Sequence, residues 1–389
     1  MASATFRVLV RSTAVLGLLT VQPLGAQDLT DRVEFSHRVG IGAAVGNSVI
    51  ELSDGGFAAV GYVDTGGPNQ IDVQVVRLDP SGTVVWEQSY GQTGDDYGWD
   101  LTENELGEIV VVGYTTSTEA GDEDVLLLGI GPMGTLRWRR RFGGDRNERA
   151  WSLERAPDGG MAIAGETQSV GDPDWDAYML RLTQGGNQMW AQVLGADGVD
   201  RVFDVALAED GGFVFVGTTT SELDSPRDLY FIRVDALGKP LWQRAFGGDA
   251  DDVAHGVVSV GDGGFVVTGY GSSFGAGGND AYLIYLADDG VIEWRNEIGG
   301  AGDDRAMMSV PTAEGGFLTI GSTDADGDWN LLLLETDARG DRVAERTLQT
   351  PGMDRGVRML QASDGGYLLT GAFGGDERSS RFGILKVRP

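Results

Sequence analysis

The sequence predicts an all-β fold, a seven-bladed β-propeller of four-stranded blades, and two observations predict it. A short glycine-rich turn followed by an apolar run recurs along the chain, and its copies begin at positions 54, 106, 158, 210, 262, 314 and 364. Successive copies are therefore 52 residues apart five times and 50 residues apart once. Every copy except the last holds four short β-rich segments bounded by Gly and Asp turn residues, as a propeller blade requires. Seven such copies predict seven blades.

The copy between Asp252 and Gly300 shows the predicted blade most clearly. Its β-rich segments are separated by Asp-Gly-Gly and Asp-Asp-Gly sequences, which favour tight turns. The predicted strands, in chain order, are Ala254–Val260, Phe265–Tyr270, Asp280–Leu286 and Val291–Ile298.

Three positions recur closely enough between copies to be interpreted. A glycine at the end of the second strand implies positive φ or close backbone approach, and it is Gly61, Gly113, Gly165, Gly217, Gly269, Gly321 and Gly371. A position within the first strand, interpreted as inter-blade packing, holds Trp99, Trp151, Phe203, His255, Met307 and Val357. A tryptophan in the fourth strand is expected to dock between adjacent blades rather than on a ligand, and it is Trp86, Trp138, Trp190, Trp242 and Trp294.

The last copy lacks a fourth strand, because the chain ends at Pro389 after the third. The segment 33–40 matches the fourth strand of the fifth copy, with Phe35 in the tryptophan position. We therefore expect this N-terminal segment to pair with Phe382–Val387 and close the ring, which removes open sheet edges between the two ends of the chain.

Residues 1–26 are interpreted as a signal peptide and residues 27–389 as the propeller. Arg7 and Arg11 precede a short apolar stretch, and Leu24-Gly25-Ala26 resembles a cleavage site. The apolar stretch is too short to span a bilayer. The chain has no cysteine, which excludes a lipid anchor at the cleavage site and any disulfide. These features predict a secreted or periplasmic protein without a membrane span.

The formal net charge of −30 makes the surface strongly acidic. Such a surface repels nucleic acid and anionic lipid, so neither is expected as a partner. The expected partner is a protein, peptide or glycan, and the expected oligomeric state is a monomer.

Segments such as 262–270 (DGGFVVTGY), 273–284 (SFGAGGNDAYLI) and 238–248 (GKPLWQRAFGG) resemble a propeller repeat of secreted bacterial and archaeal proteins. That repeat is related to the quinoprotein-like, tryptophan-docking propellers. The resemblance covers all seven copies and implies the fold, but it implies no activity, because most members have none assigned. Quinone-dependent dehydrogenases carry eight blades and often a vicinal cysteine pair, which this chain cannot supply. A redox enzyme is therefore not expected.

Two acidic rows recur with the blade period. The first opens the first strand of each blade and comprises Asp96, Glu148, Asp200, Asp252, Asp304 and Asp354. The second opens the third strand and comprises Asp72, Asp124, Asp176, Asp228 and Asp280, with Asn330 in blade six. Both rows are expected at one end of the central channel. They either accept backbone N–H groups there or bind cations, and arginines following the first row suggest ion pairs.

The loops beside these rows offer further candidate ligand contacts. Trp175, Phe274 and Trp329 are expected to present apolar surface on the same face. Asp324, Asp326, Asp328 and Asn330 alternate oxygen ligands along a glycine-containing loop, which predicts either a partial calcium site or an ordinary acidic turn. Trp329 stands where an EF-hand requires glycine, which excludes that motif. Calcium is the one cofactor considered.

No motif predicts catalysis. His37 and His255 are the only histidines, which excludes a three-histidine metal site, and no nucleophile elbow, phosphate loop or dinucleotide fingerprint occurs. The sequence favours a non-enzymatic binding or interaction scaffold in the cell envelope or outside the cell. Two alternatives remain open, namely a hydrolase or lyase acting on extracellular polysaccharide and a purely structural envelope component.

Overall fold

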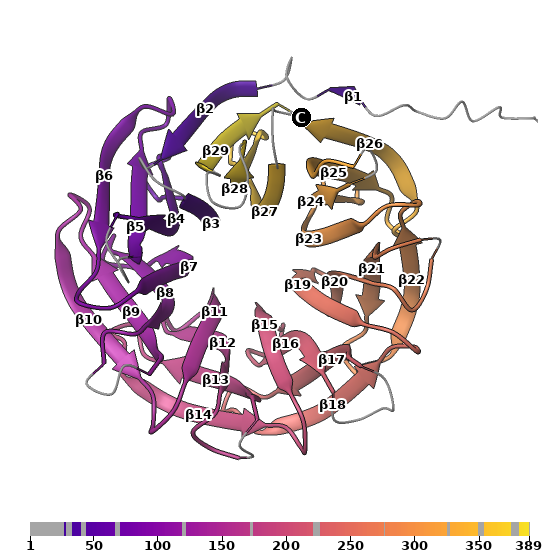
Figure 1. The fold of residues 1–389 in the computed structure, drawn as a ribbon, viewed down its shortest axis with the longest axis horizontal. Coiled ribbons are helices and arrows are strands. Elements are labelled where there is room, and N and C mark those ends of the chain that lie inside the picture. The colour runs from indigo at the N-terminus through magenta and orange to yellow at the C-terminus, as the bar shows by residue number, and fades with distance from the viewer. Residues whose placement is uncertain are drawn as a thin grey trace, which may run out of the picture.

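The computed structural model describes residues 27–28, 33–39, 44–66, 71–118, 122–171, 174–220, 226–275, 277–324, 327–348, 354–374 and 381–388. Over these residues the chain forms strands and turns without any helix. Seven antiparallel blades stand around a central axis, which confirms the predicted seven-bladed propeller (Figure 1). Within a blade the strands run from the axis outward, so the first is innermost and the fourth is outermost. The described residues contain no helix long and apolar enough to cross a membrane.

The first four blades follow the chain without interruption. Blade one comprises β3 (Ala44–Glu51), β4 (Phe57–Asp64), β5 (Ile71–Leu78) and β6 (Val84–Tyr90). Blade two comprises β7 (Asp96–Glu103), β8 (Ile109–Thr115), β9 (Asp124–Ile130) and β10 (Leu136–Phe142). Blade three comprises β11 (Glu148–Arg155), β12 (Met161–Thr167), β13 (Asp176–Leu182) and β14 (Gln188–Leu194). Blade four comprises β15 (Asp200–Leu207), β16 (Phe213–Thr219), β17 (Asp228–Val234) and β18 (Pro240–Phe246).

The last three blades include both ends of the described chain. Blade five comprises β19 (Asp252–Val260), β20 (Gly264–Gly271), β21 (Asp280–Leu286) and β22 (Ile292–Ile298). Blade six comprises β23 (Asp304–Pro311), β24 (Phe317–Thr323), β25 (Asn330–Thr336) and β26 (Arg342–Leu348), and β1 (Gln27–Asp28) adds to β26 in parallel. Blade seven comprises β27 (Asp354–Gln361), β28 (Tyr367–Phe373), β29 (Arg381–Val387) and β2 (Val33–Val39).

The ring closes as the sequence predicts. Strand β2 pairs antiparallel with β29, with Val39 opposite Phe382, and supplies the fourth strand of blade seven. Between blades seven and one, the Glu51 carboxylate accepts hydrogen bonds from the backbone N–H and the hydroxyl of Ser363 at 2.7 and 2.6 Å. The two ends of the chain therefore hold one blade together, while hydrogen bonds to the exposed turn at Ser363 join that blade to the next.

The outer tryptophans dock between blades, as predicted. Each lies against the tight-turn glycine between the third and fourth strands of the following blade, so that a Cβ on Gly238 would lie 2.6 Å from the ring of Trp190. Trp86 and Trp242 also donate their indole N–H groups to backbone carbonyls of the next blade, each at 2.8 Å. Phe35 occupies the same place against Gly82. The N-terminal strand thus repeats the docking contact as well as the pairing.

Every innermost strand carries a β-bulge at the same place. Its pairing with the second strand shifts by one residue, so that one residue in each blade has no partner across the ladder. The glycine at the end of the second strand permits the bulge, because a Cβ on Gly61 would lie 1.8 Å from the Val45 carbonyl oxygen. The six equivalent glycines show the same approach, at 1.8–2.1 Å. Close backbone approach, rather than positive φ, explains this recurring glycine.

Candidate functional site

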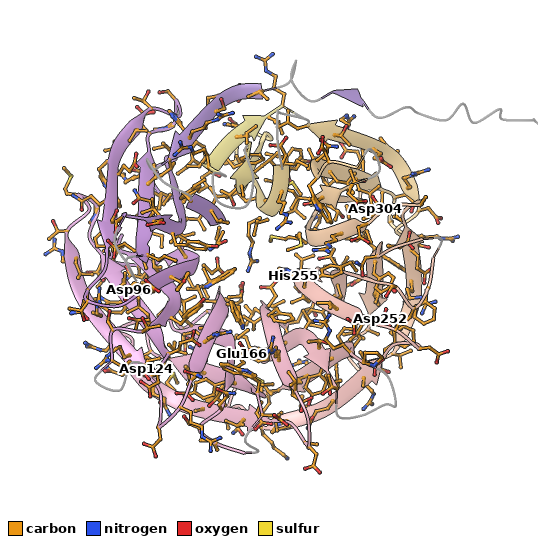
Figure 2. The ribbon with its side chains drawn as sticks, in the orientation of Figure 1. Asp96, Asp124, Glu166, Asp252, His255 and Asp304 are labelled. Atoms are coloured by element: carbon orange, nitrogen blue, oxygen red, sulfur yellow. The ribbon has the colours of Figure 1, made fainter. Side chains whose placement is uncertain are left out.

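The first acidic row opens the innermost strands, on the face that we call the mouth face, and its members Asp96, Asp252 and Asp304 are labelled in Figure 2. The side chains of this row are at most 9% exposed: Asp96, Glu148, Asp200, Asp252, Asp304 and Asp354. Five of them accept the backbone N–H of the residue four positions earlier, at 2.7–3.0 Å. Asp354 instead accepts the N–H of Gly374 at 3.0 Å. These carboxylates therefore order the turns between blades and are not the groups that the mouth face exposes; a ligand-binding role for them stays a prediction.

The three predicted loop aromatics lie half-buried on the mouth face, and each contacts arginine. The Arg295 guanidinium lies 4.1 Å from the centre of the Phe274 ring. Trp175 lies between Arg149 and Arg201, at 4.9 and 5.7 Å. Trp329 lies between Arg305 and Arg355, at 4.7 and 5.3 Å. Cation–π contacts of this kind hold guanidinium groups that would otherwise move freely.

The predicted calcium loop is only partly described. Asp326 lies outside the described residues, while the Asp324 carboxylate accepts the backbone N–H of Asp303. Asp328 is exposed, and Asn330 is buried with its amide donating to the Asp328 carbonyl at 3.1 Å. Among the described residues, no group of three or more His, Cys, Asp or Glu side chains could hold a metal ion. A calcium site that includes Asp326 stays a prediction.

A pocket of about 410 Å³ opens at the axis on the mouth face, and we call it the mouth pocket. Residues of blades one, two, five, six and seven line it. They are Val45, Asn47, Tyr62, Trp99, His255, Tyr270, Arg305, Met307, Ser322, Trp329, Arg355, Gly356, Val357 and Ala372. Its volume lies within the range of small-molecule sites, and its lining combines aromatic rings with two guanidinium groups.

The arginines of blades three and four, which do not line this pocket, pair with carboxylates from the preceding or the same blade. The Glu123 carboxylate binds Arg149 through two oxygens, at 2.5 and 3.0 Å. The fully buried Glu166 lies 3.5 Å from Arg149 and 2.7 Å from Nε of Arg201. Burial raises the pKa of Glu166 to about 7, and the two arginines oppose the rise. The pair to Arg201 is one of the inter-blade ion pairs that the sequence suggested.

The unpaired bulge residues form the floor of the mouth pocket. Together with Arg358 they enclose a further cavity of about 50 Å³, and they are Asn47, Trp99, Trp151, Phe203, His255, Met307 and Val357. The rings of Trp99 and Trp151 meet edge to face with their centres 4.7 Å apart, and His255 stacks on Phe203 at 5.9 Å. Burial, with Arg358 adding to it, lowers the pKa of His255 to about 4, so its imidazole is neutral at pH 7.

The rings of this set pack between neighbouring blades, as predicted, and they do so at the axis of the ring. The bulge rotates these side chains out of the alternation of the strand and aims them at the axis, where they pack against one another. The glycine that recurs opposite the bulge could have indicated this orientation. The sequence alone, however, did not distinguish positive φ from close backbone approach at that glycine.

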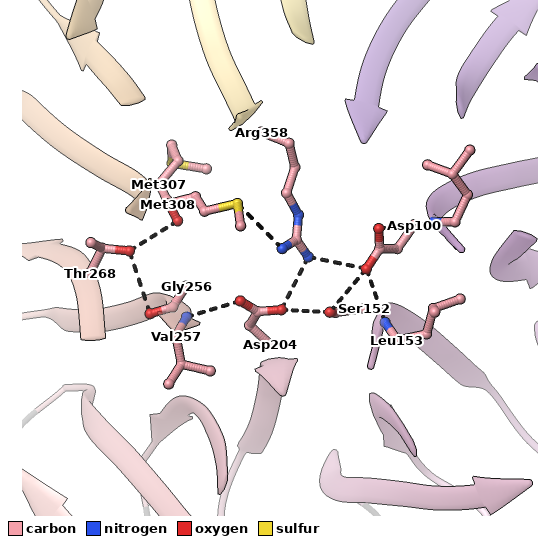
Figure 3. A network of polar contacts seen from close by, with 11 residues as sticks. Asp100, Ser152, Leu153, Asp204, Gly256, Val257, Thr268, Met307, Met308 and Arg358 are labelled. Atoms are coloured by element: carbon pink, nitrogen blue, oxygen red, sulfur yellow. Dashed lines mark hydrogen bonds and ion pairs between the residues drawn. The ribbon is translucent and has the colours of Figure 1, made fainter. Parts of the chain in front are cut away.

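Arg358 closes the channel below this layer (Figure 3). Its side chain extends from β27 of blade seven to Asp204 of blade four at 3.1 Å and to Asp100 of blade two at 3.4 Å. Both carboxylates are buried and also accept backbone N–H groups, from Val257 at 2.9 Å and Leu153 at 3.0 Å. The network therefore ties distant blades together across the axis and makes the mouth pocket blind.

Glu154 lies beside this network, in a cavity of about 430 Å³ at the other end of the channel. Burial raises its pKa to about 8, Asp204 and Asp100 add to the rise, and Arg358 opposes it. The unfolded chain loses this proton near pH 4.3, so between about pH 4.3 and 8 the folded protein binds a proton that the unfolded chain lacks. The stabilisation associated with the protonated side chain is complete below that window and is lost as the pH rises through it.

Replacing Glu154 by glutamine is expected to remove this pH dependence. The free energy of unfolding of the Glu154→Gln variant should exceed that of the wild type by about 1 kcal/mol or more at pH 8, because one unit of pKa corresponds to about 1.4 kcal/mol. The difference should shrink towards pH 4.5. Urea unfolding from pH 4.5 to 8.5 measures it, with Glu293→Gln on the exposed side of β22 as the matched control. A constant difference across this range would contradict the assignment.

No protein-family model matches the chain. It is 26% identical over 199 residues to the regulatory protein FlaEY of Caulobacter vibrioides, an alignment covering 44% of this chain and 21% of that protein. Thus the chain spans about a fifth of the length of this relative.

Among solved structures, the chain is similar to the WD40 domain of Neurospora crassa Pan2, with 9% identity, 92% and 97% of the two chains covered, and a TM-score of 0.57. It is similar to YCF48 bound to D1 peptide, with 11% identity, 95% and 100% covered, and a TM-score of 0.56. It also resembles Sqt1 from Chaetomium thermophilum, with 14% identity, 87% and 82% covered, and a TM-score of 0.51. At these identities the likeness shows the propeller fold alone.

Proposed function

We propose that this propeller is a non-enzymatic binding module, exported to the periplasm or secreted, whose ligand enters the mouth pocket. The observation that carries the proposal is the pocket itself, a blind cavity of about 410 Å³ lined by stacked arginines and aromatic rings. All of its lining residues except Trp329 lie on the first or second strand of a blade, so little ordering accompanies binding. The proposed export depends on the signal-peptide pattern of residues 1–26, which lie outside the described residues.

The comparisons support a protein or peptide as the first class of ligand to examine. One structural neighbour is a propeller bound to a peptide, and the curated relative carries the name of a regulatory protein. Glycans remain in the proposal, because aromatic rings such as Tyr62 and Trp99 also suit the faces of sugar rings.

A substitution that fills the mouth pocket tests this proposal independently of the chemistry of the ligand. Met307 lines both the pocket and its floor, so Met307→Trp should grow into open space. A displayed random-peptide library and a glycan array serve as probes of the protein beginning at residue 27. The wild type should retain ligands that Met307→Trp loses by about tenfold or more, whereas Leu241→Trp, at an exposed site on β18, should keep them.

Two results would contradict the proposal. One is that the wild type retains no probe, and the other is that its ligands bind Met307→Trp equally well. Val357→Phe fills the same pocket from the neighbouring blade, so the test holds if the first variant does not fold.

A polysaccharide hydrolase is the second candidate, and Glu154 is the observation that favours it. A carboxyl group with a raised pKa beside two other carboxylates is the pattern of a general acid in glycosidases. The geometry supports this candidate less, because Asp100 and Asp204 already accept hydrogen bonds from backbone N–H groups and Arg358. Release of reducing ends from polysaccharide that disappears in Glu154→Gln would establish it.

A further inference from the structure

The constellation of one tryptophan between two arginines occurs twice in the ring. In blades three and four it consists of Trp175, Arg149 and Arg201, and in blades six and seven of Trp329, Arg305 and Arg355. The members occupy the same positions of the repeat, each tryptophan directly before the third strand and each arginine second in an innermost strand. The protein therefore contains two versions of one arrangement, which we call the closed copy and the open copy.

The closed copy is filled by a carboxylate of the protein itself. Glu166 follows the recurring glycine of β12, is fully buried, and lies against Arg149 at 3.5 Å and Arg201 at 2.7 Å. In the open copy the corresponding residue after the glycine is Ser322, which is buried, uncharged and shorter. Ser322 lines the mouth pocket. Where the closed copy holds its own carboxylate, the open copy thus borders a cavity.

Two buried donors beside the mouth pocket have no hydrogen-bond acceptor among the described residues. Nε of Arg305 and the indole N–H of Trp99 are buried, and neither has a hydrogen-bond partner within the described residues. Arg305 forms an ion pair with Asp303 at 3.5 Å through another nitrogen. None of the described residues that line the mouth pocket is acidic, although the chain carries a net charge of −30. The pocket is therefore a locally basic, donor-rich site on an acidic protein.

We infer that the mouth pocket binds a small organic carboxylate carried on an aromatic or apolar body. This inference rests on the proposed function and names the ligand class for the same pocket. The ligand carboxylate lies against Arg305 and Arg355, in the place that the Glu166 carboxylate takes in the closed copy. A guanidinium group can donate two parallel hydrogen bonds to the two oxygens of a carboxylate. The body packs among Tyr62, Trp99 and Met307. A carboxylate is preferred to a phosphate because the group that lies between the two arginines of the closed copy is the carboxylate of Glu166.

Isothermal titration with matched probes tests this inference in 0.3 M NaCl, which screens non-specific attraction between ions. The probes are 3-phenylpropionate, whose acid group matches the glutamate side chain, its neutral amide 3-phenylpropionamide, and inorganic phosphate. The wild type should bind the carboxylate about tenfold or more tightly than the amide, because hydrogen bonds to charged groups are the stronger ones. Phosphate should compete weakly. Arg305→Lys keeps the charge but cannot donate two parallel hydrogen bonds, and it should weaken binding of the carboxylate by about tenfold.

The variant Ser322→Glu supplies the open copy with the carboxylate of the closed copy. It should no longer bind 3-phenylpropionate, and it should melt at a higher temperature than Ser322→Gln, which has the same size without the charge. Arg244→Gln, on the exposed side of β18, is the matched control that should bind as the wild type does.

Equal binding of carboxylate and amide, equal binding of phosphate, or retained binding in Ser322→Glu would each overturn the carboxylate assignment. If 3-phenylpropionate does not bind while Met307→Trp still removes ligands found on the peptide library or glycan array, the carboxylate inference fails and the proposed function stands. If neither set of ligands depends on the mouth pocket, both fail.

Discussion

Removing residues 27–40 is expected to lower the free energy of unfolding by about 4 kcal/mol or more, an effect that few single changes reach. The deletion removes β2, which pairs with β29 along blade seven, and Phe35, which docks on the turn of blade one at Gly82. It also exposes one side of β29, whose residues from Phe382 to Val387 are buried. An exposed apolar strand edge invites pairing with other chains, so the variant should also self-associate.

Thermal and urea unfolding of the chain beginning at residue 41, compared with the chain beginning at residue 27, measures the effect. A synthetic peptide of residues 33–39 should restore part of the lost stability, because the open edge of β29 can accept it as a fourth strand. Equal melting temperatures for the two chains would show that the terminal strand is not the closure of the ring. Light scattering separates a loss of stability from self-association.

The sequence was sufficient for the architecture because the evidence for it repeats. Each copy carries its own turn glycines and apolar segments, so the blades could be aligned with one another, and the fourth strand of blade seven was identified by the place of Phe35 in that alignment. The strand boundaries were less certain. Strand β19 begins at Asp252, two residues before the predicted Ala254, because the carboxylate of Asp252 accepts a turn N–H from within the ladder.

The functional site was harder to predict because side-chain direction on the innermost strands depends on the bulge. Alternation along a strand would place Trp99 and His255 in the sheet interfaces, whereas one extra residue turns them to the axis. The acidic row posed a similar difficulty. An aspartate that begins a strand can face solvent or bond a turn amide, and only the burial of Asp96 and its equivalents decides between these.

A signal for the mouth pocket was nevertheless present in the repeats. The position after the recurring glycine is Glu166 in blade three and Ser322 in blade six, while the neighbouring arginines and tryptophans are kept. That difference becomes meaningful once the fold brings Arg201 against Glu166 from the next blade. A contact between residues of two blades cannot be predicted from the sequence of one repeat alone.

The channel ends differ in a way that suits a binding module. On the mouth face an open pocket presents guanidinium groups, whereas at the other end Arg358 is used within the protein to hold Asp100 and Asp204. A channel closed at one end gives a ligand one route in and a rigid floor. The stability of that floor therefore bears on the shape of the pocket above it.

Replacing Arg358 by alanine is expected to cost about 3–5 kcal/mol of unfolding free energy at pH 7, because it leaves two buried carboxylates without their cation. Asp100 and Asp204 are 6% and 2% exposed, so water cannot replace the guanidinium. The variant should also lose the constraint that links blade seven to blades two and four. Urea unfolding at pH 7 measures the loss, and Arg244→Ala, at an exposed position of β18, should change the free energy by less than about 1 kcal/mol.

A further variant separates unpaired charge from lost packing. The triple variant Arg358→Met, Asp100→Asn and Asp204→Asn removes the charges together and should recover more than half of the loss, since apolar or neutral replacements of a buried ion pair are often well tolerated. If the triple variant recovers none of the loss, the guanidinium acts through its bulk alone. The channel would then be closed by packing, and the mouth pocket would keep its floor without the charge network.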